Sequence, residues 1–351
     1  MLDSGGKVNM SNLRVAVIGV GHLGKEHARV YTELPGVELV GVVDIQHEQA
    51  EKISQQYNTQ CFSNYKEAIG KVEAVSIAVP TKSHYLIAKE FLLNGVHVMI
   101  EKPMTGTVSE ARELIDISKA KRVVLQAGYI ERFNPAIDAI KKLSINPRFI
   151  ECHRLSPFTF RSADIGVVLD LMIHDIDIVL HITGSRVKKF DAVGVNVISD
   201  KEDIANVRIQ FQNGCVANLT ASRVSITSMR KMRLFSEDSY ISIDYQKRDA
   251  LIYKKSPKLT LKALNIAEMD ASTIADLKSY AFGDLLKVEH ITMGNYEPLK
   301  KELESFVDCI VKHKDPVVSG EEGLKAIEVA NDILCEIEKN LKFAHNTGYG
   351  G

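Results

Sequence analysis

The sequence RVAVIGVGHLG, residues 14–24, joins a short apolar run rich in β-branched residues to three glycines spaced Gly-x-Gly-x-x-Gly. The apolar run predicts a buried parallel strand, and a helical pattern follows it through Tyr31. A second apolar run, Val37 to Asp44, ends in an acid twenty residues after Gly24. In this context the glycines predict a tight turn that lets the backbone approach a pyrophosphate at the helix N-terminus.

Asp44 indicates which dinucleotide this turn would hold. Its carboxylate would accept hydrogen bonds from the adenosine ribose hydroxyls, whereas a 2′-phosphate would meet a like charge. No arginine follows in Ile45-Gln46-His47. The sequence therefore predicts that this turn binds NAD rather than NADP. The alternative for the motif as a whole is a glycine turn in some other α/β protein. The predicted cofactor-binding residues are Gly19, Gly21, His22, Leu23, Gly24, Asp44, Ile45, Pro80, Thr81, His84, Glu101 and Lys102.

Strand and helix patterns continue to alternate as far as residue 133. Repeated strand–helix units with short connections predict a doubly wound parallel sheet. Ligands bind beyond the carboxyl ends of the strands in such sheets. Three loops at those ends therefore carry the informative residues, and they are 80–84, 101–103 and 128–135.

The pattern changes after Asn134-Pro135. Several runs with alternating apolar and polar residues follow, and Asn213-Gly214 is a strong hairpin turn between two of them. We expect an α+β domain with a mostly antiparallel open sheet and one inserted helix. The predicted organisation is a flexible tail (1–11), a dinucleotide-binding domain (12–133), a second domain (134–343) with an irregular segment at 256–284 and two terminal helices, and a tail (344–351).

The inserted helix, LDLMIHDIDIVLHIT at 169–183, is apolar around most of its circumference, which predicts burial. Four titratable residues form one narrow stripe on it: Asp170, His174, Asp177 and His181. Unpartnered buried groups are costly, so the stripe is expected to face a polar cavity or an internal network. Asp175 points elsewhere and is expected to be a surface or capping charge.

Composition excludes several classes of protein. The net charge is −1, with 44 Lys and Arg against 45 Asp and Glu, so nothing points to nucleic acid or a membrane surface. No apolar run is long enough to span a bilayer. The five cysteines are scattered without a Cys-x-x-Cys pair, which predicts reduced thiols in a cytoplasmic protein.

These residues together resemble the Gfo/Idh/MocA oxidoreductases. The resemblance runs from Arg14 to about Leu341 and rests on a set of motifs: GVGHLG, Asp44, AVPTKSH, Glu101-Lys102-Pro103, Arg132-Phe133-Asn134-Pro135 and Asp170-x-x-x-His174. It implies a Rossmann domain that holds NAD(P) and a second domain whose open sheet packs against another subunit, giving a homo-dimer or homo-tetramer. It also implies metal-free catalysis, with Lys102, Asp170 and His174 around the reacting carbon of a sugar or polyol. An ion held by Asp170, His174 and Asp177 is the alternative, but no further ligand stands at a recognisable spacing.

The chemistry of these three residues agrees with that resemblance. Oxidation of a secondary alcohol needs a base for the hydroxyl proton and a charge that stabilises the developing alkoxide. His174 suits the base near neutral pH, and Lys102 provides a fixed positive charge. Asp170 could orient the imidazole or bind a neighbouring hydroxyl. The division of proton transfer between Lys102 and His174 stays open.

A narrower resemblance concerns the substrate. Residues 153–158, Arg161 and residues 168–177 resemble the UDP-N-acetylglucosamine 3-dehydrogenases of lipid A precursor synthesis, which make a 3-keto sugar for a partner aminotransferase. Arg154 and Arg161 are candidate phosphate clamps, because guanidinium matches phosphate bidentately. The alternative for each is a structural arginine paired with an acid. The predicted substrate-binding residues are Arg132, Asn134, Arg154, Arg161, Asp170 and His174, with Arg223 a further candidate.

Three other functions stay open at this stage. The chain could act on a free sugar or inositol, it could be a glycoside hydrolase that uses NAD transiently, or it could be an NAD-responsive regulator. Net NADH formation separates a dehydrogenase from the hydrolase. The presence of Lys102, Asp170 and His174 together counts against a regulator.

Overall fold

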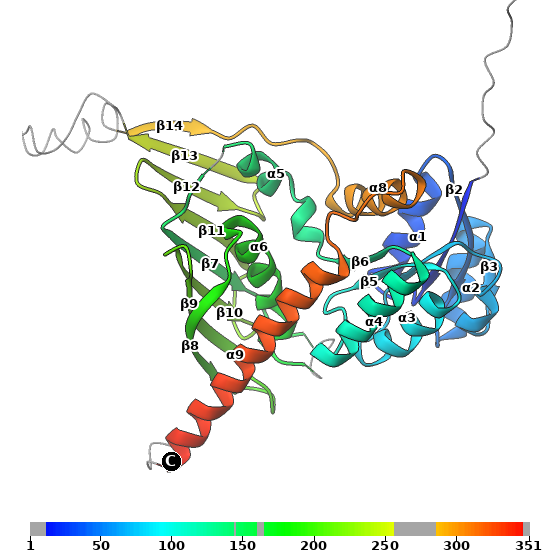
Figure 1. Ribbon diagram of the computed structural model, residues 1–351, viewed down its shortest axis with the longest axis horizontal. Helices are drawn as coiled ribbons and strands as arrows, with labels where there is room; N and C mark the ends of the chain where they lie inside the picture. The colour runs from blue at the N-terminus through cyan, green and yellow to red at the C-terminus, as the bar shows by residue number, and fades with distance from the viewer. Residues whose placement is uncertain (1–11, 144, 160–164, 256–285, 347–351) are drawn as a thin grey trace, which may run out of the picture. The chain divides into compact units, whose positions relative to one another are not determined.

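The computed structural model describes residues 12–143, 145–159, 165–255 and 286–346 (Figure 1). The predicted N-terminal tail, the irregular segment at 256–284 and Arg161 lie outside these residues. The chain divides into two compact units. The first contains the residues up to Phe133 together with Tyr296–Val329, and the second contains Asn134–Asn295 and the residues from Ala330 onward.

The first unit contains a six-stranded parallel sheet, here called sheet A, in the order β3-β2-β1-β4-β5-β6 (Figure 1). Its strands are β1 (Leu13–Ile18), β2 (Val37–Val43), β3 (Gln60–Phe62), β4 (Ala74–Ile77), β5 (His97–Glu101) and β6 (Leu125–Gly128). Helices α1 (Gly24–Glu33), α2 (His47–Tyr57), α3 (His84–Leu93) and α4 (Val108–Lys121) connect them. This confirms the predicted doubly wound sheet. The strand order reverses at β1 and β4, where such sheets bind nucleotides beyond the carboxyl ends.

Local sequence signals explain most of these boundaries. The capping box that starts α4 is present, since Thr107 and Glu110 each accept the other's main-chain N–H. Asn64 caps a 3₁₀ turn, Tyr65–Ala68, by accepting the N–H of Lys66. β3 was not predicted, because three residues are too few for a periodic pattern to register.

Helix α8 (Pro298–Val311) and the start of α9 (Gly320–Asn346) belong to the first unit, which differs from the domain division predicted from the sequence. The reason is the apolar face of α8. Leu303 and Phe306 on that face are fully buried, in one core with residues of α1 and β1. Sequence periodicity shows that a helix has an apolar face but not which unit covers it. α9 extends into the predicted C-terminal tail as far as Asn346, and residues 347–351 lie outside the described part.

The second unit contains an eight-stranded sheet, here called sheet B, in the order β14-β13-β12-β11-β7-β10-β9-β8. All neighbours in it are antiparallel except β7 and β10, which confirms the predicted mostly antiparallel sheet. The strands are β7 (Phe149–Leu155), β8 (Val187–Val195), β9 (Ile204–Phe211), β10 (Val216–Ser222), β11 (Met229–Phe235), β12 (Ser239–Asp244), β13 (Asp249–Lys255) and β14 (Leu286–His290). β14 was not predicted.

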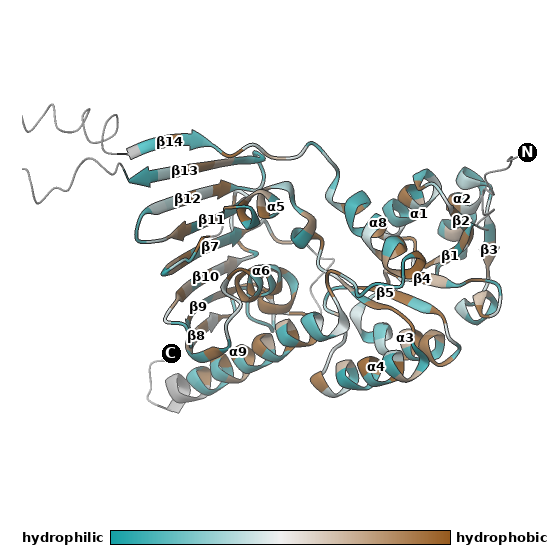
Figure 2. Cartoon of the chain, turned by 45° about the horizontal axis from the view of Figure 1, so that its top comes forward, coloured by the Kyte–Doolittle hydropathy of each residue, from teal (hydrophilic) through white to brown (hydrophobic). Residues whose placement is uncertain are grey.

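One face of sheet B packs against helix α6 (Ile173–Thr183), while α5 (Pro135–Lys141) precedes β7 in the chain (Figure 2). Burial alternates along the strands, so Ile150 and Cys152 of β7 are buried while Phe149 and Glu151 face the other side and stay partly exposed. The face opposite α6 is here called the open face. It bears an aromatic row in which Phe149, Phe235, Tyr240 and Tyr253 stack at centroid distances of 5.5, 4.8 and 5.0 Å.

The inserted helix does not begin as an α-helix. Val168–Met172 form a π turn, and the N–H of Ile173 donates to the carbonyl of Val168 five residues back. Such turns are rare in proteins, and those that do occur are often at functional sites. Asp170 lies in this turn, and His174 is the second residue of α6. The predicted stripe therefore begins in a π turn, which apolar periodicity alone did not reveal.

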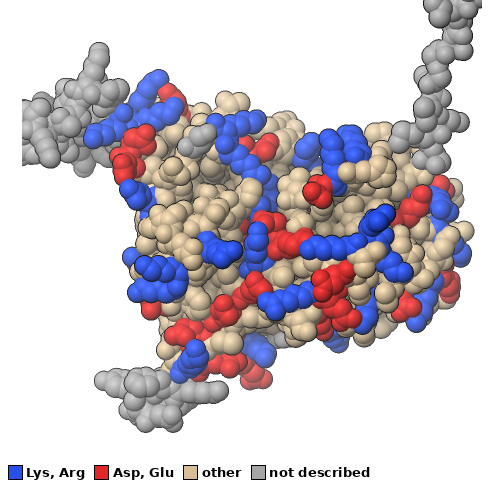
Figure 3. Space-filling view, viewed as in Figure 1, with Lys and Arg blue, Asp and Glu red and all other residues tan. Residues whose placement is uncertain are grey.

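The surface agrees with the balanced composition. Lys and Arg side chains are intermixed with Asp and Glu on the face drawn in Figure 3. Within the described residues, no helix combines the length and the apolar character that crossing a bilayer would require.

Candidate active site

The glycine turn between β1 and α1 has the geometry of a phosphate cradle. Gly19 has φ +86°, and a Cβ there would lie 2.7 Å from Val79 Cγ1. A Cβ on Gly24 would lie 1.7 Å from the carbonyl oxygen of Gly19, so only glycine lets α1 start this close to the turn. A Cβ on Gly21 would meet nothing within 4 Å, which leaves space over the turn. His22 and Leu23 are exposed beside it. The turn therefore fits a dinucleotide pyrophosphate at the N-terminus of α1.

Asp44 follows β2 and faces the same turn. Its Oδ2 accepts the N–H of Val20 at 2.8 Å, and its Oδ1 accepts the N–H of Gln46 at 2.9 Å. The carboxylate is thus fixed by main-chain donors and remains partly exposed. Ile45 beside it is fully exposed. A negative group held at this point suits ribose hydroxyls and opposes a phosphate.

His84, the first residue of α3, is buried and lies between two loops. Its Nδ1 is 2.9 Å from the carbonyl oxygen of Pro103, and its Nε2 is 2.7 Å from that of Val79. Burial lowers the pKa of His84, which favours the neutral ring, and a neutral ring donates from one nitrogen only. Its observed partners are main-chain oxygens of the loops after β4 and β5. Pro80 is exposed, and Thr81 is partly exposed.

Glu101 and Lys102 lie at the carboxyl end of β5, and a cis peptide bond joins Lys102 to Pro103. Glu101 Oε1 is 3.1 Å from Nε2 of the buried His27 on α1. Burial raises the pKa of the Glu101 carboxyl, but the hydrogen bond from His27 and the positive charge of Lys102 outweigh it and hold that pKa below its usual range. Lys102 is half-buried. The loop after β5 thus offers a cation next to a buried carboxylate.

Two predicted substrate-binding residues follow β6. Arg132 is buried, and its Nη2 pairs with Glu322 Oε2 of α9 at 3.0 Å, within the first unit. Asn134 caps α5 by accepting the N–H of Ala136 at 3.0 Å. Both residues therefore have a structural partner within the chain.

In the second unit, Asp170 lies in the π turn and His174 is the second residue of α6. Both are partly exposed, whereas Asp177, one turn further along α6, is buried. Each of these residues has an interaction partner. The stripe is therefore partly accessible at Asp170 and His174 and buried at Asp177.

The expectation for Asp175 was wrong. Asp175 is buried, and its carboxylate receives Arg154 Nε at 3.0 Å and Arg154 Nη2 at 2.8 Å. Arg154 is also buried, since it lies on the α6-facing side of β7. Arg154 is therefore a structural arginine paired with an acid, which was the alternative to a phosphate clamp. Apolar coverage of a helix does not tell which of its charges has a buried partner on another element.

Sequence reasoning missed a group of residues beneath the start of this helix. Glu202 Oε1 accepts the N–H of Val168 at 3.2 Å, and a Cβ on Gly166 would lie 1.9 Å from the same oxygen. Asp203 accepts the N–H groups of residues 197–199 and pairs with Arg223 Nε at 2.8 Å. The adjacent acids at 202–203, next to a strand, were the available signal. Arg223, a lesser candidate for substrate binding, is committed to this network.

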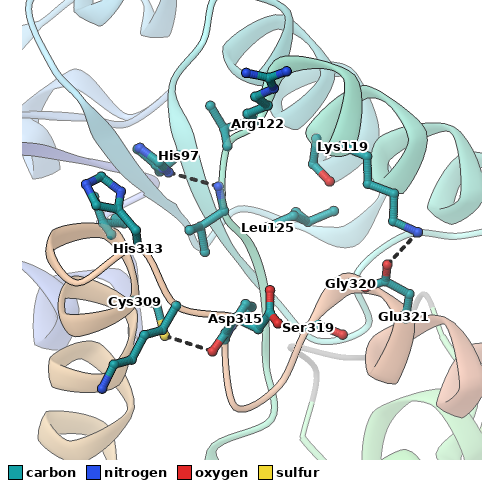
Figure 4. Close-up of a pocket in the computed structure, with 16 residues that line it drawn as sticks. His97, Lys119, Arg122, Leu125, Cys309, His313, Asp315, Ser319, Gly320 and Glu321 are labelled. Atoms are coloured by element: carbon teal, nitrogen blue, oxygen red, sulfur yellow. Dashed lines mark hydrogen bonds and ion pairs between the residues drawn. The ribbon is translucent and has the colours of Figure 1, made fainter.

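Among the described residues, no group of three or more histidine, cysteine, aspartate or glutamate side chains is arranged to hold a metal ion. A cavity of about 600 Å³ opens at the amino ends of β5 and β6, lined in part by His97, His313 and Lys119 (Figure 4). The glycine turn, Asp44 and Lys102 lie at the carboxyl ends of the strands. The cavity is therefore at the other edge of sheet A from the candidate site.

The fold and the site define a class of protein, the two-domain oxidoreductases that use a nicotinamide dinucleotide. Residues 13–129 match the model of the oxidoreductase family with an NAD-binding Rossmann fold, and residues 146–241 match the GFO/IDH/MocA C-terminal domain. The chain belongs to the GFO/IDH/MocA oxidoreductase family.

Three relatives are similar over most of the chain. UDP-N-acetylglucosamine 3-dehydrogenase of Acidithiobacillus ferrooxidans is 34% identical over 334 residues, covering 95% of this chain and 100% of the relative. Its solved structure matches with a TM-score of 0.83, covering 93% of this chain and 98% of that one. Inositol 2-dehydrogenase of Rhizobium meliloti is 23% identical, covering 95% and 99%. A levoglucosan dehydrogenase in complex with NADH, 19% identical with a TM-score of 0.78 and coverage of 93% and 97%, shows the shared fold alone.

Proposed function

We propose that this chain is an NAD-dependent dehydrogenase that oxidises the 3-hydroxyl of UDP-N-acetylglucosamine to the 3-keto sugar. The observation that carries the proposal is the similarity to the Acidithiobacillus ferrooxidans enzyme, which spans that relative's whole length. The predicted catalytic residues Lys102, Asp170 and His174 support it. The glycine turn and Asp44 support the choice of cofactor.

The proposed reaction separates a proton and a hydride from one secondary alcohol. NAD, when bound, supplies the hydride acceptor. The hydroxyl proton passes to a ring nitrogen of His174 as the carbon–hydrogen bond breaks, and the C–O single bond becomes a carbonyl. The ammonium of Lys102 stabilises the negative charge that develops on that oxygen. Asp170, four residues before His174, orients the imidazole or holds a neighbouring hydroxyl.

The preference for NAD over NADP rests on Asp44. Its carboxylate is fixed by the N–H groups of Val20 and Gln46, so it cannot swing away from a 2′-phosphate without losing both bonds. We predict that Asp44→Ala lowers the ratio of kcat/KM for NAD to kcat/KM for NADP by about tenfold or more. The reason is that a repulsion of more than about 1.4 kcal/mol between the carboxylate and the 2′-phosphate is removed. The check is kcat/KM for both cofactors. A wild-type enzyme that uses NADP equally well would contradict this assignment.

The predicted clamps for the diphosphate of the nucleotide sugar are Arg154 and Arg161, and Arg132 is a further candidate. Arg132 and Arg154 already pair with carboxylates, so a diphosphate bound there would join an existing ion pair. Arg161 lies outside the described residues. Substitution of Arg161 by Ala, with KM for UDP-N-acetylglucosamine as the readout, tests its part.

We further propose the setting of the reaction. The 3-keto product suits a partner aminotransferase that installs a 3-amino group in the lipid A precursor pathway, in the cytoplasm. A homo-dimer or homo-tetramer formed through the open face of sheet B is the proposed assembly. Exposed apolar side chains on that face support it, among them Val193 and Val195 of β8.

Isotopic labelling tests the position that is oxidised. The chain is incubated with NAD and UDP-N-acetylglucosamine carrying deuterium at C3, with a ketone trap, and the reduced cofactor is analysed by mass spectrometry. The proposal predicts NADH heavier by one mass unit from the C3-labelled sugar and unlabelled NADH from sugar labelled at C4. Transfer of the label from C4 would overturn the proposal. Transient reduction of NAD with release of the sugar and no net NADH would also overturn it and would indicate the glycoside hydrolase.

A further inference from the structure

The buried His27 has no part in the chemistry proposed above. It lies on α1, three residues after the last glycine of the turn, and its side chain is 1% exposed. Nε2 is 3.1 Å from Glu101 Oε1, and Nδ1 has no hydrogen-bond partner within the described residues. Burying an imidazole costs free energy unless its polar atoms are satisfied. Within the described residues, the hydrogen bond with Glu101 is therefore the polar contact that satisfies part of this buried ring.

A glycine on the neighbouring strand β6 also leaves space for the Glu101 side chain. Glu101 is paired with Gly128 across β5 and β6, and a Cβ on Gly128 would lie 3.1 Å from Glu101 Cα and 3.2 Å from its Cδ and Oε1. A larger residue at 128 would press on the carboxylate. Glycine at this position keeps the space that the His27–Glu101 pair occupies.

The pair also acts on the next residue in the chain. Glu101 Oε2 accepts the main-chain N–H of Lys102 at 3.3 Å, while Oε1 is held by His27. The carboxylate thus spans from α1 to the backbone of Lys102. Its charge lies close enough to act on the ammonium of Lys102. Glu101 thus links His27 to the backbone and to the charge of Lys102.

We propose that His27 is a positioning residue for Lys102 and acts through Glu101. The His27–Glu101 pair fixes an ionised carboxylate against the Lys102 backbone, which sets the orientation and the protonated state of the Lys102 amine. The proposal rests on the proposed function in that Lys102 is taken as catalytic. It adds a buried pair, anchored on the helix that follows the glycine turn, to the machinery of the reaction.

The first test compares His27→Gln with a matched control, His97→Gln. His97 is the first residue of β5, as Glu101 is the last, and its Nδ1 accepts the N–H of Val124 at 2.8 Å (Figure 4). We expect His27→Gln to lower kcat by about 10- to 100-fold, since small displacements of a catalytic group have effects of that size. KM for NAD should change little. His97→Gln should keep wild-type kcat. Equal kcat losses in the two variants, or wild-type kcat in His27→Gln, would overturn the proposal.

A double-mutant cycle separates positioning from general damage to the fold. Lys102→Ala and the double variant His27→Gln/Lys102→Ala should have the same residual kcat, because a residue that acts through Lys102 has nothing left to position. Losses that multiply would show that His27 acts independently of Lys102 and would overturn the proposal.

A third measurement needs no substrate, so it separates failure of this inference from failure of the proposed function. Lysine labelling by an amine-reactive reagent near pH 8.5 is followed by peptide mass spectrometry. Removing the carboxylate charge with Glu101→Gln, or its anchor with His27→Gln, should raise the labelling rate of Lys102 by about threefold or more, because an adjacent anion favours the unreactive ammonium. The exposed Lys121 serves as internal control. An unchanged Lys102 rate in both variants would refute the inference even if UDP-N-acetylglucosamine is turned over.

Discussion

At the scale of single residues, the two adjacent carboxyls Glu202 and Asp203 differ in the sign of their contribution to stability. Burial raises the pKa of Glu202, in spite of the hydrogen bond from Val168 N–H. Burial also acts to raise the pKa of Asp203, but the main-chain donors and Arg223 outweigh it and hold that pKa well below its usual range. Asp203 is therefore ionised and paired beneath the start of α6, while burial disfavours the ionised form of Glu202.

These shifts predict opposite effects of two isosteric changes. A depressed folded pKa stabilises the fold at pH above the unfolded value of about 3.9 and loses that stabilisation as pH falls through the folded pKa. Asp203→Asn should therefore lower the free energy of unfolding at pH 7 by about 3 kcal/mol, since it removes the carboxylate charge that faces the buried Arg223. The deficit should shrink as the pH is lowered below about 4.

Glu202→Gln should leave stability at pH 7 unchanged or raised. A raised folded pKa means that the ionised carboxyl costs stability above that pKa and that folding is favoured as pH falls through it. Denaturant unfolding of both variants and wild type between pH 3 and 8 checks the pair. A loss in Glu202→Gln as large as that in Asp203→Asn would show that the direction assigned to Glu202 is wrong.

The catalytic assignment makes a second prediction at this scale. Lys102→Ala and His174→Ala should each lower kcat by about 10²- to 10⁴-fold, which is the usual contribution of a positioned acid or base. Lys121→Ala and His313→Ala remove the same residue types from exposed positions and should keep wild-type kcat. The measurement is initial rate at saturating NAD and sugar, with circular dichroism to confirm folding.

The backbone geometry of the glycine turn could be predicted from the sequence, because the motif itself dictates it. The glycine turn and the fixed Asp44 are local, so spacing alone was enough to find them. The Arg154–Asp175 pair joins β7 to α6 across 21 residues, and His27 reaches Glu101 across 74. Such pairs depend on how elements pack, which one sequence without its fold does not reveal.

At the scale of elements, α8 shows how packing decides the membership of a unit. The sequence predicted two terminal helices, and α8 is the first of them. The face packs into the core of the first unit with α1. Nothing in the period of a helix specifies which sheet it covers.

The packing of α8 predicts a clear loss of stability. Leu303→Ala should lower the free energy of unfolding by about 2–5 kcal/mol, because Leu303 is fully buried and its truncation leaves a cavity. Leu86→Ala is the matched control, since Leu86 on α3 is 64% exposed, and its effect should stay within about 0.5 kcal/mol. Hydrogen exchange should show the added exposure in α1 and β1. Exchange that rises only in sheet B would contradict the assignment of α8 to the first unit.

At the scale of the whole molecule, sheet B leaves its open face with a stacked aromatic row and exposed valines. Large exposed apolar areas mark interaction sites in soluble proteins. The family resemblance in the sequence led to the same expectation of an assembly through this sheet. The number of subunits stays a prediction.

The assembly can be tested without disturbing the core. Val195→Glu places a charge on the open face at a position that is 49% exposed, so the folded unit should tolerate it. We expect wild type to run as a dimer or tetramer in size-exclusion chromatography with light scattering and the variant to shift toward monomer. Leu86→Glu on α3 serves as control and should keep the wild-type mass. A wild-type chain that is monomeric at tens of micromolar would contradict the proposed assembly.

The proposed oxidation of a nucleotide sugar with NAD can be measured by the reduced cofactor that it forms. The most direct test is absorbance of NADH when purified protein is mixed with NAD and UDP-N-acetylglucosamine, with an aminotransferase and its amino donor or a ketone trap to draw off the product. Parallel reactions contain free N-acetylglucosamine, glucose or inositol. We expect sustained NADH formation with the nucleotide sugar and little with the free sugars or inositol. Turnover of only the free sugars or inositol would contradict it, and so would tight NAD binding without net NADH from any of them.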